Sequence, residues 1–470
     1  MRRVLHLHTA FLIPILVWML IGLGALLRTY HADIFPIDNN DDGLYYVWTG
    51  TSLLQSPSQV HSHTIFDSDN AALIWRSQYY DYVPHLRFGM KIVEPWFDHP
   101  PLGSLIAGFP AYLLGYDQVE QMPHMIVRYP ALIASIFTLL GIYLLAQKLF
   151  GTRTALFSLL FAATTPYFVF AHRQSYLENF LTPVFLGSLI SYLYYQESKR
   201  PWQLYLSLLL SFLCGWFKIP AFAIPLMLAG WSYYLKNKKL ALLFLLSFIV
   251  SLSSYVAYGL LTSSDFFLNT LSNQGVRGMY LSSFIESFVK PMFYGEFMDG
   301  LYILGLLFSF VVLLKREKTS YEKFFSWFFM AWIIVLFLVS GKYNNSPWYR
   351  YPLIPFMSIS IGIYADELWK KKSLFIAALF LLFGFSGYTL AGIELSSTIL
   401  RISTLLVFAP FVLIFFHPKN KWLEYLSSVM VIVLLGLVIF GNILAIKQYP
   451  YEKCEKEPCL QPTKIIFDRS

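Results

Sequence analysis

Residues 10–27 read AFLIPILVWMLIGLGALL, and residues 28–46, which follow directly, read RTYHADIFPIDNNDDGLYY. The first stretch is close to the roughly 20 apolar residues that cross a bilayer as one helix. Met1, Arg2 and Arg3 precede it as in a signal peptide, but the run is long and no small-residue cleavage site follows it. We therefore expect an uncleaved first membrane span that is followed at once by a long polar loop.

Comparable apolar segments recur along the whole chain. Of the 470 residues, 57% are hydrophobic and only 13% are charged, which is too apolar for a soluble core of this length. The segments are centred near Met19, Ile136, Leu160, Leu186, Leu208, Pro225, Phe248, Leu307, Val335, Ile359, Phe380, Phe408 and Leu434. They predict an all-α, polytopic integral membrane protein of about 13 transmembrane helices, with a large first extracytoplasmic loop that contains interfacial helices.

The basic residues indicate how the chain is oriented. The formal net charge is +8, but Lys and Arg occur in small packets between apolar segments, so we expect no nucleic-acid partner. If the N-terminus is cytoplasmic, alternation of the spans places six packets on the cytoplasmic side: Lys148/Arg153, Lys199/Arg200, Lys236/Lys238/Lys239, Lys315/Arg316/Lys318, Lys370/Lys371/Lys372 and Lys419/Lys421. This pattern predicts a multi-pass protein of the cell membrane.

The same alternation places the polar stretches on the extracytoplasmic side, at residues 28–128, 172–179, 262–299 and 341–347. Chemistry is therefore expected on that face. Within the first loop, residues 102–114 are apolar but too short to span, begin after two prolines and stop at Gly115. They predict a helix lying in the membrane interface, and residues 42–54 predict a second one with acidic residues at its positive end.

Two acidic motifs in the first loop are candidates for chemistry. Asp41 and Asp42 follow the first span, where a carboxylate can accept the proton of an attacking hydroxyl or amine. Holding a divalent cation is the rival role, and an ordinary helix start is the structural alternative. Asp98 and His99 precede two prolines that fix the backbone and aim both side chains at one place, unless they form only a solvated turn.

Four cations lie at predicted extracytoplasmic span ends, where orientation does not require them: Arg173, Lys218, Lys342 and Arg350. Charge held near the membrane is costly, which makes a functional role the working hypothesis. Such cations beside the headgroup plane would recognise a phosphate, with Arg giving forked contacts and Lys a point charge. Snorkelling of each side chain to the interface is the alternative.

A group of His61, His63, Asp67 and Asp69 has the residue types of a metal site. It has no helical spacing, so we interpret it as part of an irregular, solvated loop.

The motifs together resemble the polyprenyl-phosphate-sugar-dependent glycosyltransferases of the GT-C superfamily, in particular the protein O-mannosyltransferase and aminoarabinose-transferase group. The matching segments are DDGLYY (41–46), DHPPLG (98–103), RYPALIAS (128–135), KLFG (148–151) and WYRYPLIP (348–355). The resemblance covers roughly residues 10–365. It implies a GT-C-like catalytic core at residues 1–365 with its first loop at about 28–128, C-terminal transmembrane helices at 366–446, and a short extracytoplasmic tail at 447–470.

The resemblance also implies the activity and the roles of residues. The expected reaction is an inverting transfer of one monosaccharide from a polyprenyl- or dolichyl-phosphate donor to an acceptor that the sequence does not identify. Asp41 falls on the family's catalytic base and Asp42 on its neighbour. The donor and sugar pocket is expected to involve Asp98, His99, Arg173, Glu178, Lys218, Lys342, Arg350 and Tyr351.

A transporter or flippase of a lipid-linked glycan is the alternative function. It should show ionisable residues in the middle of its spans and broken helices in corresponding halves. The acids lie in a loop instead, which favours the enzyme. No cofactor is required by this reading, and a divalent cation at the acidic pair stays open.

Overall fold

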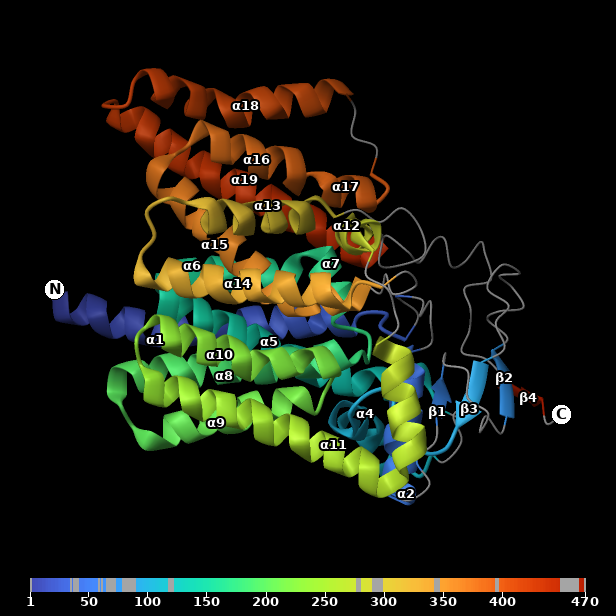
Figure 1. Ribbon diagram of the computed structural model, residues 1–470. Helices are drawn as coiled ribbons and strands as arrows, with labels where there is room; N and C mark the ends of the chain where they lie inside the picture. Colours follow the sequence, from blue (N-terminus) through green and yellow to red (C-terminus); the bar gives the residue numbers. More distant parts are fainter. Residues whose placement is uncertain are drawn as a thin grey trace.

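The protein is a bundle of long, side-by-side helices with smaller elements gathered at one end (Figure 1). The computed structural model describes residues 2–33, 36, 42–57, 60, 62–64, 73–77, 90–116, 122–275, 280–289, 299–341, 347–393, 397–448 and 465–468. The helices of the bundle are α1 (Arg2–Thr29), α5 (His124–Phe150), α6 (Thr152–Thr164), α7 (Pro166–Ala171), α8 (Leu177–Ser198), α9 (Pro201–Gly215), α10 (Ala223–Tyr234), α11 (Lys238–Gly275), α13 (Gly300–Leu314), α14 (Ser320–Val339), α15 (Ile354–Lys371), α16 (Leu374–Gly384), α18 (Ser397–Phe416) and α19 (Lys421–Gln448).

The predicted class, an α-helical multi-pass membrane protein, is confirmed. Within the described residues, five helices are long and apolar enough to cross a membrane, namely α1, α5, α11, α14 and α19. Each of the thirteen predicted apolar centres lies in a helix of its own, but a count of thirteen spans stays a prediction. The predicted division after residue 365 falls inside α15, and the division into domains also stays a prediction.

The basic packets gather at the end of the bundle where the N-terminus lies. Figure 1 shows the turns α5–α6, α8–α9, α10–α11, α13–α14, α15–α16 and α18–α19 at that end, and α2 (Asp42–Gln55), α4 (Pro101–Leu113), α12 (Leu281–Val289) and the strands at the other. This one-sided arrangement is the one that the alternation of spans predicts.

The two short helices predicted in the first loop are present. The helix α4 begins at Pro101, immediately after Pro100, and ends before Gly115, whose φ of 76° suits glycine. The helix α2 begins at Asp42, and its middle turns are buried. Both helices lie at the end of the bundle opposite the basic turns (Figure 1).

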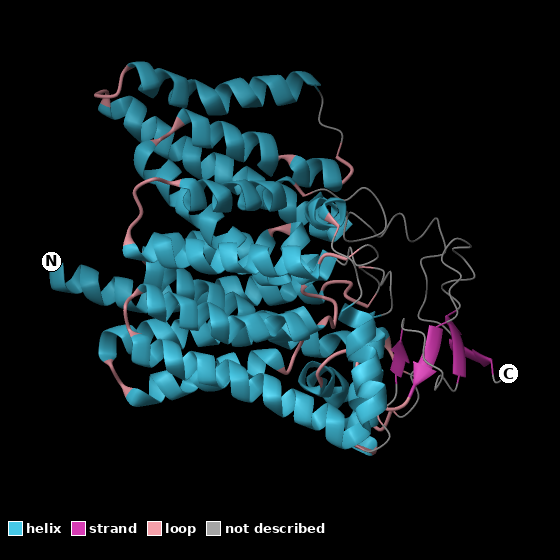
Figure 2. Ribbon diagram, viewed as in Figure 1, coloured by secondary structure: helices cyan, strands magenta, loops and turns pink. Residues whose placement is uncertain are grey.

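A small antiparallel sheet is the part of the fold that the sequence did not indicate (Figure 2). Its strands are β1 (Ser62–Thr64), β2 (Leu73–Ser77), β3 (Met90–Val93) and β4 (Ile465–Asp468), in the order β1-β3-β2-β4. Ser62 pairs with Val93, and Ile74 pairs with both Lys91 and Asp468. The prediction of an irregular loop around His63 is therefore wrong for residues 62–64, because these residues form β1. The C-terminal tail joins the first loop in one sheet.

Candidate active site

Side chains from four separate segments of the chain surround the buried phenol of Tyr46 on α2. The pKa of Tyr46 lies well above its usual range, first because the ring is buried and then because of the nearby groups Asp42, Glu178, Tyr349 and Asp98. We call Asp42, Asp98 and Glu178 the acidic cluster. The cluster brings together acids from the start of α2, the turn before α4 and the start of α8.

A buried ion pair joins the acidic cluster to Lys218. Lys218 Nζ lies 2.5 Å from Glu178 Oε1, and the two side chains are only 2% and 1% exposed. Burial acts to lower the pKa of Lys218, but Glu178, Tyr349 and Asp42 outweigh it and raise this pKa above its usual value. The ammonium also lies 3.9 Å from the ring centre of Tyr349. Lys218 is therefore charged and faces the same space as the acids.

Only one oxygen of Glu178 is engaged by Lys218. The other, Oε2, is buried and has no hydrogen-bond partner among the described residues. Removing two charges from water costs several kcal/mol per ion, so an ion pair of this kind is a costly way to stabilise a fold. This cost favours a role for the pair in binding or catalysis.

Close backbone contact between α2 and α4 fixes the two acidic motifs relative to each other. A Cβ atom added at Gly50 would lie 1.7 Å from the carbonyl oxygen of Ser104, and one added at Gly108 would lie 2.3 Å from the backbone nitrogen of Thr51. Only glycine allows the helices to cross at this distance. The crossing sets the start of α2, with Asp42, against the turn that precedes α4.

That turn, which holds Asp98 and His99, is tied to α11. Gln274 Nε2 donates a 2.6 Å hydrogen bond to the carbonyl of Asp98, and the hydroxyl of Tyr255 donates to the carbonyl of Phe97 at 3.3 Å. The His99 ring lies 5.7 Å from the ring of Tyr46, measured between centroids. The His99 ring therefore lies beside Tyr46, and Asp98 is close enough to raise the pKa of Tyr46.

Arg350 lies in η4 (Pro347–Leu353), beside the adjoining rings of Tyr167 and Tyr302. Its guanidinium is 5.3 Å and 5.1 Å from the two ring centres, and its Nε donates to the Tyr167 hydroxyl at 2.5 Å. Nη1 donates to the carbonyl of Ser287. Its neighbour Tyr351 is buried, and the Tyr351 hydroxyl donates to Gln174 Oε1 at 3.1 Å.

Arg173 lies between α7 and α8, and its fully buried side chain reaches the C-terminal end of α1. Its Nη2 donates to the carbonyl of Leu27 at 2.7 Å. Arg28, which sequence reasoning used only as the boundary of the first span, lies close enough to affect Arg173 electrostatically, and its Nη2 lies 3.3 Å from His172 Nδ1. Burial and the charge of Arg28 lower the pKa of His172 to about 3, so this imidazole is neutral at physiological pH.

Two predicted site residues, Asp41 and Lys342, lie outside the described residues. Among the residues that are described, no group of three or more His, Cys, Asp or Glu is arranged to hold a metal ion.

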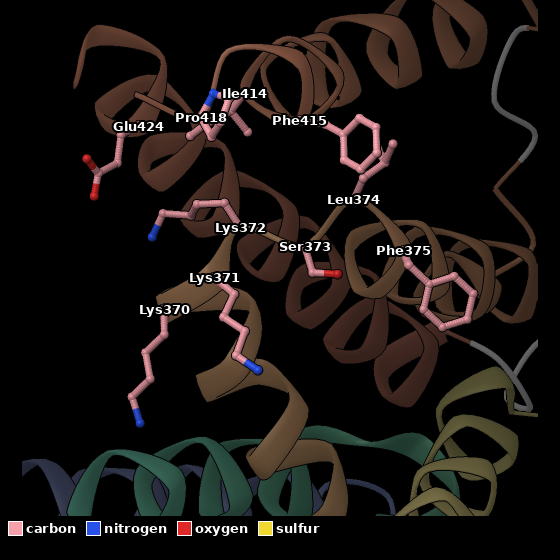
Figure 3. Close-up of a pocket in the computed structure, with 10 residues that line it drawn as sticks. All are labelled: Lys370, Lys371, Lys372, Ser373, Leu374, Phe375, Ile414, Phe415, Pro418 and Glu424. Carbon is pink, nitrogen blue, oxygen red and sulfur yellow. The ribbon is translucent and has the colours of Figure 1, made fainter. Parts of the chain in front are cut away.

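A cleft of about 500 Å³ lies at the opposite end of the molecule (Figure 3). Lys370, Lys371 and Lys372 from the α15–α16 turn line it, with Phe415 and Glu424 from the α18–α19 region. Because Lys370 and Lys371 already pair with Asp366 and Glu367, and because this turn is one of the basic packets, we assign the lysines to orientation in the membrane.

Sequence reasoning missed several residues of the site. Tyr349 and Tyr302 lie in segments rich in aromatic residues, where the interfacial belt is the commoner role. Asp299 and Tyr167 contact each other from positions far apart in the chain. A proline within an apolar segment, Pro166, was the one local signal that a helix would break beside Tyr167.

Comparison with known proteins identifies the fold. The family described as dolichyl-phosphate-mannose-protein mannosyltransferase matches residues 98–260, which include the turn at Asp98, Glu178 and Lys218. No curated protein matches the chain by sequence.

Two solved structures have the same fold. ArnT from Cupriavidus metallidurans, bound to undecaprenyl phosphate, superposes with a TM-score of 0.52 at 15% identity, over 92% of this chain and 76% of ArnT. The oligosaccharyltransferase of Archaeoglobus fulgidus superposes with a TM-score of 0.52 at 12% identity, over 93% of this chain and 56% of that one. The resemblance predicted from the motifs is confirmed: the chain has the fold of the GT-C glycosyltransferases, with the protein-mannosyltransferase signature in residues 98–260.

Proposed function

We propose that this protein is an inverting glycosyltransferase of the cell membrane. It transfers one monosaccharide from a polyprenyl- or dolichyl-phosphate donor to a lipid, glycan or protein acceptor on the extracytoplasmic face. The observation that supports this most is the acidic cluster around Tyr46, with its buried Lys218, at the end of the bundle opposite the basic turns. ArnT, which has the same fold, was crystallised with undecaprenyl phosphate, and this supports a lipid-phosphate donor.

The proposed step needs a base and cations but no nucleotide. Asp41 accepts the proton of the acceptor hydroxyl or amine, with Asp42 beside it. The acceptor atom then bonds to the anomeric carbon from the face opposite the phosphate. The bond from that carbon to the phosphate oxygen breaks, and the polyprenyl phosphate leaves with the electron pair. Cations stabilise the charge that develops on the departing phosphate.

The remaining residues have roles on the two sides of the breaking bond. We assign the sugar pocket to Asp98, His99, Glu178 and Lys218. We assign recognition of the carrier phosphate to Arg173, Lys342, Arg350 and Tyr351. The buried position of Lys218 beside Glu178 supports the first group, because Glu178 fixes the positive charge of Lys218 within the acidic cluster.

The test is a transfer assay with purified protein in liposomes, a panel of radiolabelled polyprenyl-phosphate sugars and a membrane extract as the source of acceptor. Asp41→Asn is expected to lower the transfer rate by about 100- to 10,000-fold, the usual contribution of a general base. Asp33→Asn, an exposed acid at the end of the first span, is the matched control and should stay active.

The other outcomes of this assay are informative. Full activity of both Asp41→Asn and Asp42→Asn contradicts the proposal. Label that crosses the bilayer without changing its chemical partner indicates the transporter or flippase. Loss of wild-type activity on chelation, with recovery on adding a divalent cation, assigns the acidic pair to a metal instead of to base catalysis.

A further inference from the structure

A break between α6 and α7 leaves backbone groups that need partners. Pro166 has no N–H, so the carbonyl of Ala162 cannot receive the hydrogen bond that continues a helix. Arg28 supplies the missing donor, because its Nη2 lies 2.9 Å from the oxygen of Ala162. The fully buried guanidinium of Arg28 thus binds the C-terminal end of α6, where the helix dipole favours a positive charge.

The next residue after the proline is held from the opposite side. The N–H of Tyr167 would serve the carbonyl of Ala163 in a continuous helix, but it donates instead to Asp299 Oδ2 at 2.9 Å. Arg28 Nη1 lies 3.4 Å from the Ala163 oxygen that is left over. Asp299 therefore fixes the backbone at Tyr167 and stabilises the break between α6 and α7.

The same carboxylate also fixes the start of α13. Asp299 Oδ1 accepts from the backbone N–H of Leu301 at 2.8 Å, and the backbone N–H of Tyr302 bonds to the carboxylate as well. Asp299 is 1% exposed. Burial raises the pKa of Asp299 to about 6 against the opposing effect of these backbone donors, so both oxygens are acceptors at neutral pH.

The two residues whose backbones share this carboxylate are the two whose rings lie beside the Arg350 guanidinium. The rings of Tyr167 and Tyr302 lie 4.3 Å apart between centroids. Each lies within 5.3 Å of the Arg350 guanidinium, and the Tyr167 hydroxyl accepts from Arg350 Nε. The orientation of the guanidinium thus depends on two backbone segments that are joined through Asp299.

We propose that Asp299 is a positioning residue, which sets the rings of Tyr167 and Tyr302 against Arg350 and so orients the guanidinium for the donor phosphate. The proposal rests on the proposed function, in which Arg350 recognises that phosphate. The plain structural alternative is that Asp299 only caps α13. The two interpretations predict different results for a variant that still caps α13 but lacks the oxygen that accepts from the N–H of Tyr167.

Asp299→Ser provides that distinction. Serine is a favoured N-cap and keeps an acceptor for the first turn of α13, but it lacks the oxygen that binds the N–H of Tyr167. We expect an unfolding temperature in detergent near that of the wild type and an apparent KM for the lipid donor about 3- to 10-fold higher, the effect of one ordinary hydrogen bond. The KM for the acceptor should not change.

Two further variants connect the effect to Tyr167. Tyr167→Phe should raise the donor KM by a similar factor, and Asp299→Ser/Tyr167→Phe should be no worse than either single variant, because both act on one interaction. If Asp299→Ser does not fold, Asp299→Asn replaces one acceptor oxygen at constant shape and takes its place. Asp366→Asn is the matched control, a buried acid in α15 that pairs with Arg153 and Lys370 at the opposite end.

The outcomes separate this proposal from the function on which it rests. A wild-type protein that transfers no sugar from any lipid donor overturns the proposed function. An active wild type with an unchanged donor KM in Asp299→Ser, or with additive effects in the double variant, overturns the positioning role alone. An equal rise of the donor KM in Asp366→Asn also overturns the positioning role, because the loss of any buried acid would then be enough to raise this KM.

Discussion

The ion pair between Lys218 and Glu178 shows how a single residue can matter to stability and to activity in different ways. Lys218→Met leaves a buried carboxylate without its partner, which we expect to destabilise the protein by about 3–5 kcal/mol. Lys218→Met/Glu178→Gln removes both charges and should recover most of the stability but none of the activity. Unfolding in detergent and the transfer assay measure the two effects separately.

The chain supplies a control for this experiment. Lys371 pairs with Glu367, but the Lys371 side chain is 70% exposed, so Lys371→Met should change stability by about 1 kcal/mol or less. Recovery of transfer in the Lys218→Met/Glu178→Gln variant would show that the buried pair serves the fold only.

Arg350 allows a second test at the scale of one residue. Arg350→Lys keeps the charge but loses the planar group that lies beside the Tyr167 and Tyr302 rings and donates through Nε to Tyr167. We expect the donor KM to rise about 10-fold, in line with the loss of a charge-assisted hydrogen bond. Arg401→Lys, at an exposed position near the start of α18, is the control. Equal and negligible effects at both positions would remove Arg350 from the donor site.

At the scale of elements, the crossing of α2 and α4 makes a sharp prediction. Gly50→Ala places a methyl group against the backbone of Ser104, which cannot move aside as a flexible side chain can. We expect the helices to separate and the transfer rate to fall by about 100-fold, the effect of a misplacement of about 1 Å. Gly436→Ala in α19, where nothing lies within 4 Å, should be neutral or stabilising. Normal activity of Gly50→Ala would show that the close crossing of α2 and α4 is not needed to position the active site.

The elements also show what a sequence can and cannot predict. The start of α4 at Pro101 and its end before Gly115 follow from residues that act locally on their own backbone. The break at Pro166 is also local, but its partners are not: Arg28 and Asp299 reach it from other helices. Residue types alone do not reveal such pairs, because the freed carbonyl and its donor become neighbours only in the folded bundle.

The acidic cluster illustrates the same limit. Asp42, Asp98 and Glu178 were predicted as site residues from their motifs, and the structure places all three around Tyr46. The burial of Tyr46 among these acids has no local signal in the sequence. The sheet was missed for a related reason, since β4 pairs with β2 across nearly the whole length of the chain.

At the scale of the whole molecule, the orientation in the membrane is the central prediction. In a variant without native cysteines, single cysteines near Asp67 and Lys456 should react with a membrane-impermeant reagent in intact cells. Cysteines near Lys238 and Lys371 should react only after lysis, because the basic turns are expected in the cytoplasm. Reaction of the Lys238 site from outside would place the acidic cluster on the cytoplasmic face and overturn the proposed location of the chemistry.

The pairing of β4 with β2 has a consequence for biosynthesis. During synthesis β2 leaves the ribosome early, whereas β4 follows only after all of the bundle helices have been made. In the meantime the backbone groups of β2 on the side of β4 have no strand to pair with, and exposed strand edges of this kind invite wrong partners. The pairing of β4 with β2 can therefore form only after the helices between them have been synthesised.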